Sequence, residues 1–182
     1  MVVSHSLQAD KFTLNNDFAF NLTQTRKVGE IHTPRAIKAA GLEDKFFSER
    51  SRVLLEEVIP HFKATLSHNL TIGKWSGYLR NTYYGKATGP DIIAADKRIG
   101  DFEFDERGHQ VFRGKVITDL SVAYNFTPKT SLTLGVNNLL DLYPEKNVKA
   151  NSNNDQFVYS RATSQFGLNG RYVFLRATFN LF

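Results

Sequence analysis

The sequence predicts an all-β fold: an antiparallel segment of a transmembrane β-barrel, with about six long strands and long extracellular loops, which does not close by itself. Three observations predict it. Apolar and polar residues alternate with a period of two in runs of about nine to twelve residues, longer than the five or six usual in soluble sheets. Fifteen Phe and seven Tyr, against one Met and one Trp, favour sheet over helix. Short and long connections alternate between the runs, as in membrane barrels.

Six runs carry the alternation. They cover Phe12–Thr23, Phe62–Leu70, Trp75–Tyr84, Val116–Phe126, Ser131–Asp141 and Val173–Leu181. The fourth run is the clearest, because Leu120 and Val122 oppose Asp119 and Ser121. Ten residues at a rise of about 3.3 Å, tilted by about 45°, span roughly 23 Å, which is close to the height of the apolar band of a membrane barrel.

The connections between the runs differ in length. Residues 71–74 and 127–130 are expected to be tight turns on the same side of the membrane, and residues 24–59, 86–115 and 142–170 to be long polar loops. Three such loops would be unusual in a compact soluble domain. Within the first loop, residues 42–57 mix apolar and charged side chains. This pattern fits either a short surface helix or the upper part of a long strand.

The chemistry of the two faces decides what covers the apolar side. The polar faces are mostly Thr, Ser, Asn, Asp and Ala, and large aromatic residues lie near the strand ends on the apolar faces, as lipid requires. A sandwich or soluble barrel, in which a second layer of protein covers the apolar face, is the alternative. Five charges are predicted to face the barrel interior, where they bond across neighbouring strands: Asp17, Lys63, Arg80, Asp119 and Arg176.

Composition and motifs argue against other classes. Of the 182 residues, 41% are hydrophobic and 23% charged, which argues against disorder, and none is cysteine, which excludes disulfides and thiol chemistry. With a mean hydropathy of −0.34 and no apolar run of roughly eighteen residues, no transmembrane helix is expected. The net charge of +5 comes with no nucleic-acid-binding motif. No catalytic arrangement or signal peptide is found. We therefore expect no enzyme and no cofactor.

Two groups of residues could suggest a metal site. The acidic run Asp101–Glu106 could direct alternate carboxylates at a hard cation such as calcium, but it lacks the spacing and glycine of a calcium loop, and a solvated loop explains it as well. Four of the five histidines are considered as ligands, and they lack metal-ligand spacing: His32, His61, His68 and His109. No metal site is therefore predicted.

The C-terminal third carries a resemblance to a known family. Residues 118–127, the stretch Gly-Val-Asn-Asn-Leu-Leu-Asp at 135–141, and the closing segment from Gly170 to a terminal Phe182 resemble the end of a TonB-dependent outer-membrane receptor. The likeness extends, less sharply, from Phe12 to Phe182. The residues that match the family's penultimate-strand signature and terminal aromatic are Gly135, Asn137, Asn138, Leu139, Asp141 and Phe182.

The resemblance implies a function and partners. Such receptors lie in the bacterial outer membrane and import a scarce nutrient, a ferric siderophore, haem or cobalamin, through a 22-stranded barrel that holds a plug. Residues 1–182 would be the C-terminal portion of that barrel, with the plug and the earlier strands absent. The implied partners are outer-membrane lipid, the rest of the barrel and plug, the periplasmic coupling protein TonB through the plug, and a metal-chelate or vitamin substrate.

The resemblance also implies that the extracellular loops contact the substrate. The candidate loop residues are Arg26, Lys27, Arg35, Lys38, Lys97, Arg98 and Phe112. The alternative is a small soluble or surface-exposed β-sheet protein with a binding or structural role. Fractionation with the outer membrane, and a need for detergent, would separate the two hypotheses.

Overall fold

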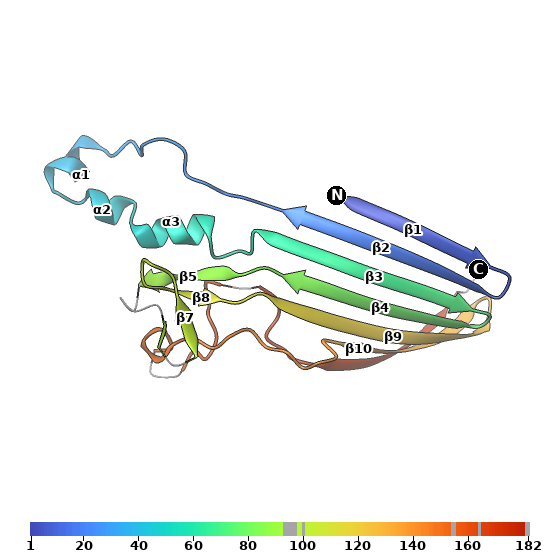
Figure 1. Ribbon diagram of the computed structural model, residues 1–182. Helices are drawn as coiled ribbons and strands as arrows, with labels where there is room; N and C mark the ends of the chain where they lie inside the picture. Colours follow the sequence, from blue (N-terminus) through green and yellow to red (C-terminus); the bar gives the residue numbers. More distant parts are fainter. Residues whose placement is uncertain (93–97, 100, 154–155, 164, 181–182) are drawn as a thin grey trace.

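The computed structural model describes residues 1–92, 98–99, 101–153, 156–163 and 165–180, and within them the chain forms two antiparallel sheets and a short helical segment (Figure 1). The main sheet has the strand order β1-β2-β3-β4-β9-β10-β11. Its strands are β1 (Val2–Ala9), β2 (Phe12–Leu22), β3 (Phe62–Ile72), β4 (Trp75–Tyr84), β9 (Lys115–Thr127), β10 (Thr130–Asn137) and β11 (Tyr172–Phe179). Among the described residues, none of the helices has the length and apolar character of a membrane span.

The six expected strands correspond to β2, β3, β4, β9, β10 and β11, so the all-β antiparallel fold, open at both edges, is confirmed. The structure adds β1, which pairs along β2 from Val2 to Ala9. Sequence alternation missed this strand because His5 and Ala9 leave only Val3 and Leu7 as large apolar residues on its apolar side.

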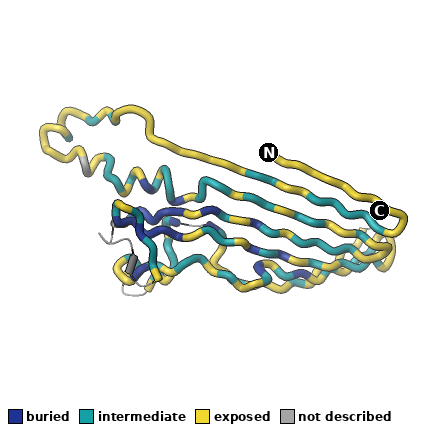
Figure 2. The backbone as a smooth tube through the Cα atoms, in the orientation of Figure 1, coloured by how far each residue is buried: buried dark blue, intermediate teal, exposed yellow. Residues whose placement is uncertain are grey.

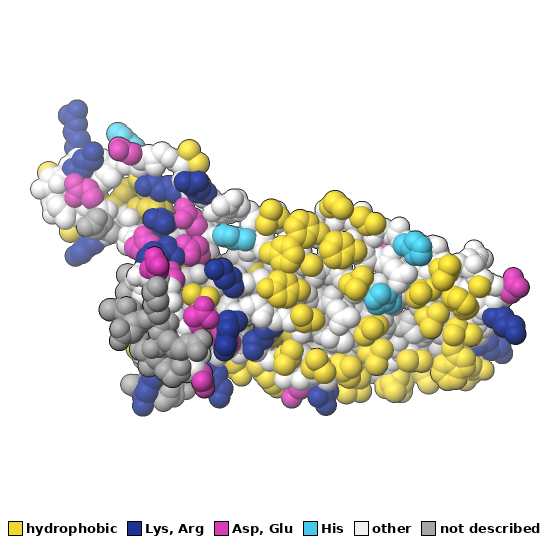
Figure 3. Space-filling model, in the orientation of Figure 1, with side chains coloured by type: hydrophobic (Ala, Val, Ile, Leu, Met, Phe, Trp, Pro, Cys, Tyr) yellow, Lys and Arg dark blue, Asp and Glu magenta, His cyan; other side chains and the backbone are white. Residues whose placement is uncertain are grey.

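The register places residues of one kind on one face of the main sheet. Leu14 of β2 pairs with Leu7 of β1 and Leu70 of β3, and the apolar rows continue to β11 in the same way. These side chains stay exposed: Leu134 keeps 56% and Leu175 67% of its accessible surface. Figure 3 shows a broad apolar surface over the strands. No other part of the described chain covers it.

The connections differ between the two ends of the sheet (Figure 1). Two-residue turns join β1 to β2, β3 to β4 and β9 to β10 at one end, where Gly73 takes a φ of +56° that favours glycine. At the other end lie the helices α1 (Arg35–Ala39), α2 (Glu43–Phe46) and α3 (Glu49–Glu56). Residues 42–57 are thus largely helical, and the Ser48 hydroxyl caps α3 by accepting from the Ser51 amide at 3.2 Å.

The second sheet also lies at this end, in the order β5-β8-β7-β6. Its strands are β5 (Ala87–Ile92), β6 (Arg98–Ile99), β7 (Phe102–Phe104) and β8 (His109–Phe112). With α1–α3 and the connection from β10 to β11, it forms what we call the loop layer. Residues 86–115, expected as an irregular polar loop, are therefore partly sheet. Strands of two to six residues are too short to give a readable alternation.

The buried apolar core belongs mainly to the loop layer (Figure 2). Val53 of α3 is fully buried and Phe112 of β8 keeps only 3% of its surface, whereas in the main sheet only Ile117 joins the core among the described residues. The core residues are Val53, Val58, Ala87, Phe104, Val111, Phe112, Ile117 and Val148. The loop layer therefore folds around a protein interior, and the main sheet does not.

Candidate functional site

A row of polar side chains crosses the polar face of the main sheet. The Ser4 hydroxyl donates to Asp17 Oδ1 at 2.5 Å, and Asp17 pairs in register with Ser67, which pairs with Arg80. Arg80 then reaches Asp119 of β9, with Nη2 at 2.7 Å and Nε at 3.0 Å from Asp119 Oδ2. The row thus crosses five neighbouring strands in register, and side-chain bonds join β1 to β2 and β4 to β9.

Asp119 uses both of its carboxylate oxygens. Oδ2 accepts from Arg80, and Oδ1 accepts from the backbone amide of Asn138 at 2.8 Å. Asp119 keeps only 9% of its surface, so an unpaired charge here would be costly. The ion pair therefore locks β4 to β9 and fixes the point where β10 ends.

All five charges predicted on the polar faces lie on one face of the sheet, but only Arg80 and Asp119 contact each other. Asp17 contacts Ser4, as described above. Lys63 places Nζ 4.9 Å from the centre of the Tyr84 ring, and Arg176 lies 5.5 Å from the Phe174 ring. The set is therefore distributed over the face and does not converge on a point.

The signature residues build the end of β10. At Gly135, a Cβ atom would overlap the ring of Phe174, which lies across it on β11, so glycine is needed for this close approach. Asn138 has a positive φ of 51°, and its side chain accepts from the Leu142 amide at 3.0 Å and donates to the Leu142 carbonyl at 2.6 Å. Asn137 is the last residue of the strand. Two of these residues thus have roles in backbone geometry.

The rest of the signature continues the turn. The Leu139 amide donates to the Thr118 carbonyl at 2.7 Å. Asp141, with a φ of 55°, accepts from the Arg171 amide at 2.7 Å and so ties the two ends of the long connection together. The run expected through Asp141 was too long, because β10 already ends at Asn137 and Asn138 leaves extended geometry. Phe182 lies outside the described residues.

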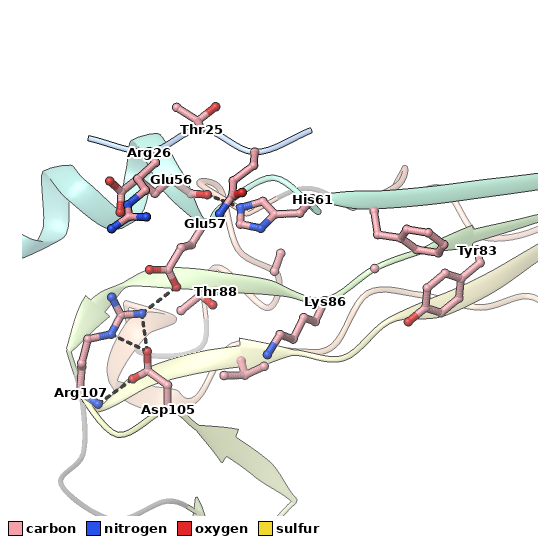
Figure 4. Close-up of a pocket in the computed structure, with 15 residues that line it drawn as sticks. Thr25, Arg26, Glu56, Glu57, His61, Tyr83, Lys86, Thr88, Asp105 and Arg107 are labelled. Carbon is pink, nitrogen blue, oxygen red and sulfur yellow. Dashed lines mark hydrogen bonds and ion pairs between the residues drawn. The ribbon is translucent and has the colours of Figure 1, made fainter. Parts of the chain in front are cut away.

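An ion-pair hub in the loop layer centres on Arg107, which sequence reasoning did not single out (Figure 4). Its guanidinium contacts Glu57 at 2.6 Å, Asp105 at 2.6 Å and Glu49 at 3.0 Å. The hydrogen bond to Arg107 lowers the pKa of the Glu57 carboxyl and raises that of the guanidinium. Burial alone would raise the pKa of Asp105, but hydrogen bonds from the His109 amide and Arg107 lower it overall.

A cavity of 870 Å³ lies beside this hub. Phe62 and Tyr83 of the apolar sheet face contribute to its wall, and Arg26, His61 and Lys86 add basic groups (Figure 4). The cavity therefore lies where the apolar face meets the loop layer. The three carboxylates in its wall already have partners. Glu56 accepts from the Lys27 amide at 2.6 Å, and Glu57 and Asp105 accept from the Arg107 guanidinium.

The acidic run Asp101–Glu106 and the histidines, considered above as possible metal ligands, lie in different environments. Asp105 of the run belongs to the Arg107 hub. The His61 ring contacts the Glu56 carbonyl at 2.5 Å, and the His68 ring contacts the Asn16 side chain at 2.6 Å. His109 is fully buried and its ring nitrogens have no hydrogen-bond partner. Within the described part of the chain, no three His, Asp or Glu side chains are grouped so as to hold a metal ion.

The candidate loop residues are dispersed as well. Arg26 lines the cavity, Arg35 and Lys38 lie in α1, and Phe112 belongs to the core. Lys27 lies over the Phe47 ring, with Nζ 5.7 Å from its centre. Lys97 and the side chain of Arg98 lie outside the described residues. The predicted contact residues that the structure describes therefore form no single cluster in the loop layer.

Solved structures of one receptor are similar to the chain. Three structures of the ferric enterobactin receptor PfeA of Pseudomonas aeruginosa, all of mutants and one in complex with enterobactin, match with TM-scores of 0.51, 0.51 and 0.53 at 16%, 15% and 15% identity. Each match covers 98% of this chain and 21% of the receptor. The chain therefore spans about a fifth of that receptor's length, and the likeness shows its fold. No protein-family model and no curated protein matches the sequence.

Proposed function

We propose that this chain is a C-terminal part of the barrel wall of a TonB-dependent receptor in the bacterial outer membrane, with a role in transport and no catalysis. One observation carries the proposal: a sheet of long antiparallel strands has an uncovered apolar face and a polar face with bonded charges. In water the apolar face would cost about 25 cal/mol per Å² of exposed apolar surface. In a bilayer such a face is required.

The two ends of the sheet support an orientation. Membrane barrels have short turns on the periplasmic side and long loops outside the cell. The two-residue turns would therefore face the periplasm, and the loop layer, with its core and ion-pair hub, would stand above the outer membrane. The polar row through Arg80 and Asp119 would line the barrel interior.

The open edges define what else the receptor must supply. The outer edges of β1 and β11 have no strand partner within the described residues. Unpaired backbone groups in lipid cost several kcal/mol each, so these edges would pair with other strands of the same barrel. The plug and its contact with TonB would belong to other parts of the receptor.

The proposed substrate is a scarce nutrient of the ferric siderophore, haem or cobalamin class. The fold similarity to a ferric enterobactin receptor favours the metal-chelate class. Uptake of a ferric siderophore by cells that carry the receptor would test this substrate class.

Cysteine substitution would test the membrane orientation of the two faces. The chain has no cysteine, so a single introduced thiol reports its own surroundings. Val122 and Ala123 are neighbours on β9 and point to the apolar and the polar face. In isolated outer membranes, a water-soluble maleimide should label Ala123→Cys severalfold faster than Val122→Cys, and a lipid-soluble reagent should reverse the order.

The same experiment includes the result that would overturn the proposal. If the unmodified chain stays in the soluble fraction, and both thiols react equally with the water-soluble reagent, the sheet is not in lipid. The soluble β-sheet protein considered from the sequence would then be the correct class. Because Val122 and Ala123 are both small and adjacent in sequence, a difference in labelling rate reports the face of the sheet to which each thiol points.

A further inference from the structure

A groove marks the apolar face near the end that carries the two-residue turns. It has a volume of 450 Å³ and is lined by side chains from four neighbouring strands, β4, β9, β10 and β11. Its lining is apolar and aromatic throughout and includes Trp75, Val122, Phe126, Leu134 and Leu175. Such a lining provides contacts for a hydrocarbon chain and almost no hydrogen-bonding groups.

The aromatic residues of the groove gather at its turn end. The ring centres of Trp75 and Tyr124 are 4.7 Å apart, and those of Tyr124 and Phe126 are 4.9 Å apart with an edge-on arrangement. Trp75 and Phe126 flank turns, while Val122 and Leu134 lie further along the strands. The groove thus runs from an aromatic end at the turns toward the middle of the sheet, as a lipid chain runs from its headgroup into the bilayer.

Lysines mark the same end. Each of the three two-residue turns contains one lysine; these residues are Lys11, Lys74 and Lys129. The Lys74 amine lies 3.5 Å from the backbone carbonyl of Phe126, one of the aromatic residues that line the groove. Lys129 belongs to the turn between β9 and β10, which both line the groove. The only carboxylate in these three described turns is Asp10, in the turn next to the sheet edge.

We propose that this groove and the adjoining lysines bind one anionic phospholipid, with an acyl chain along the groove and the headgroup phosphate at Lys74 and Lys129. The apolar lining matches the chain, and the two amines match the charge of the headgroup. The proposal rests on the proposed function, because the apolar face must lie in a bilayer with these turns at the periplasmic leaflet. The groove would then be a specific lipid-binding site on an apolar face whose other parts contact bulk bilayer lipid.

Trp75 makes the site directly measurable. It is the only tryptophan of the chain and it lines the groove, so brominated acyl chains that occupy the groove quench its fluorescence. The receptor that contains this chain, prepared with Trp75 as its single tryptophan, is reconstituted in vesicles, and mixtures with brominated phosphatidylglycerol or brominated phosphatidylcholine are compared. Phosphatidylglycerol is expected to quench severalfold more strongly at low mole fraction, and this preference should fall as salt is raised.

Matched variants identify the source of the preference. Replacing both turn lysines, Lys74→Gln with Lys129→Gln, should remove most of the preference, since a lysine near an anionic surface contributes roughly fivefold. The control variant, Lys38→Gln with Lys45→Gln, removes the same charge from exposed positions in α1 and α2. It should keep the preference of the unmodified chain.

Every outcome decides the proposal. Equal quenching by the two brominated lipids, or an equal loss in the control variant, overturns the lipid site while the sheet remains in the bilayer. Displacement of phosphatidylglycerol by lipopolysaccharide added to the vesicles would also overturn it, because the site would then belong to the other leaflet. If neither brominated lipid quenches Trp75, the sheet is outside the bilayer, and the proposed function fails with it.

Discussion

The main sheet and the loop layer bury their apolar residues in opposite ways. In the sheet, Leu134 and Leu175 point away from the chain and keep more than half of their surface. In the loop layer, Val53 and Phe112 are enclosed by helix and sheet and keep almost none. One chain thus builds a region whose apolar face no described part of the chain covers, and a region that supplies its own interior.

This difference shows where the stability of each region comes from. The sheet is held by backbone pairing across seven strands and by the Arg80–Asp119 ion pair, and its apolar face is stabilised only by what surrounds it. The loop layer is held by its small core and by the Arg107 hub. A change in one region should therefore leave the other largely intact, and three variants test this separation.

The largest effect is expected from a charge on the apolar face of the sheet. Leu120→Arg, near the middle of β9, should destabilise the membrane-inserted chain by about 2–4 kcal/mol, because an arginine would replace leucine at the depth of the bilayer midplane. Denaturant unfolding of the receptor that contains this chain, in lipid vesicles, measures the change in the free energy of unfolding. The loop layer should keep its protection from hydrogen exchange.

The neighbouring position provides the control. Ser121→Arg adds the same side chain on the polar face, where it pairs in register with Tyr78 and Gly135, and should cost far less. In a soluble protein both substitutions would fall at part-exposed surface positions and change stability by about 0.5 kcal/mol or less. Equal, small effects of the two variants would therefore contradict the membrane assignment of the sheet.

How far the sequence predicts the structure also differs between the two regions. The long strands of the sheet repeat the same two-residue pattern. This pattern predicts six of the seven strands, and it also predicts that Asp119 lies on the polar face of the sheet. The loop layer has no such repeat, since β6 has two residues and β7 three. The partners of Arg107 include Glu57 and Glu49, which lie 50 and 58 residues away in sequence, and no local spacing indicates such pairs.

The signature residues fall between these two cases. Their positions follow from the sequence, but the reason for Gly135 requires the register that brings Phe174 across it. The reason for Asn138 requires the positive φ at which β10 ends. The residue types at 135–141 thus indicate that β10 ends in a defined turn. The contact between Gly135 and Phe174 that fixes the geometry there follows only from the pairing of β10 with β11.

A smaller effect is expected in the loop layer from Val53→Ala. Val53 of α3 is fully buried, so losing two methyl groups should lower local stability by about 2 kcal/mol. Hydrogen exchange of the α3 amides should increase, while exchange in β3 and β4 stays unchanged. Leu55→Ala on the same helix is the control, because Leu55 is exposed and its loss should change little. Faster exchange throughout the main sheet would show that the two regions unfold together.

The smallest effect is expected from acid, and it should also be confined to the loop layer. Arg107 lowers the pKa of Glu57, and the pKa of Asp105 is lowered as well, so both carboxylates stabilise the folded loop layer when ionised. This contribution is complete above the ordinary carboxyl pKa of about 4 and is lost as pH falls through the lower folded-state values. Hydrogen exchange of α3 and β8, followed from neutral pH downward, should show the loss.

Arg107→Gln links that acid response to the hub. Without the guanidinium, Glu49, Glu57 and Asp105 lose their shared partner, so the loop layer should be weaker at neutral pH and lose less on acidification. The change should be modest, because these side chains are partly solvated and solvent screens their interactions. If Arg107→Gln retained the full acid response of the unmodified chain, the response would come from other carboxylates. The hub would then contribute packing rather than charge to the region that folds around its own core.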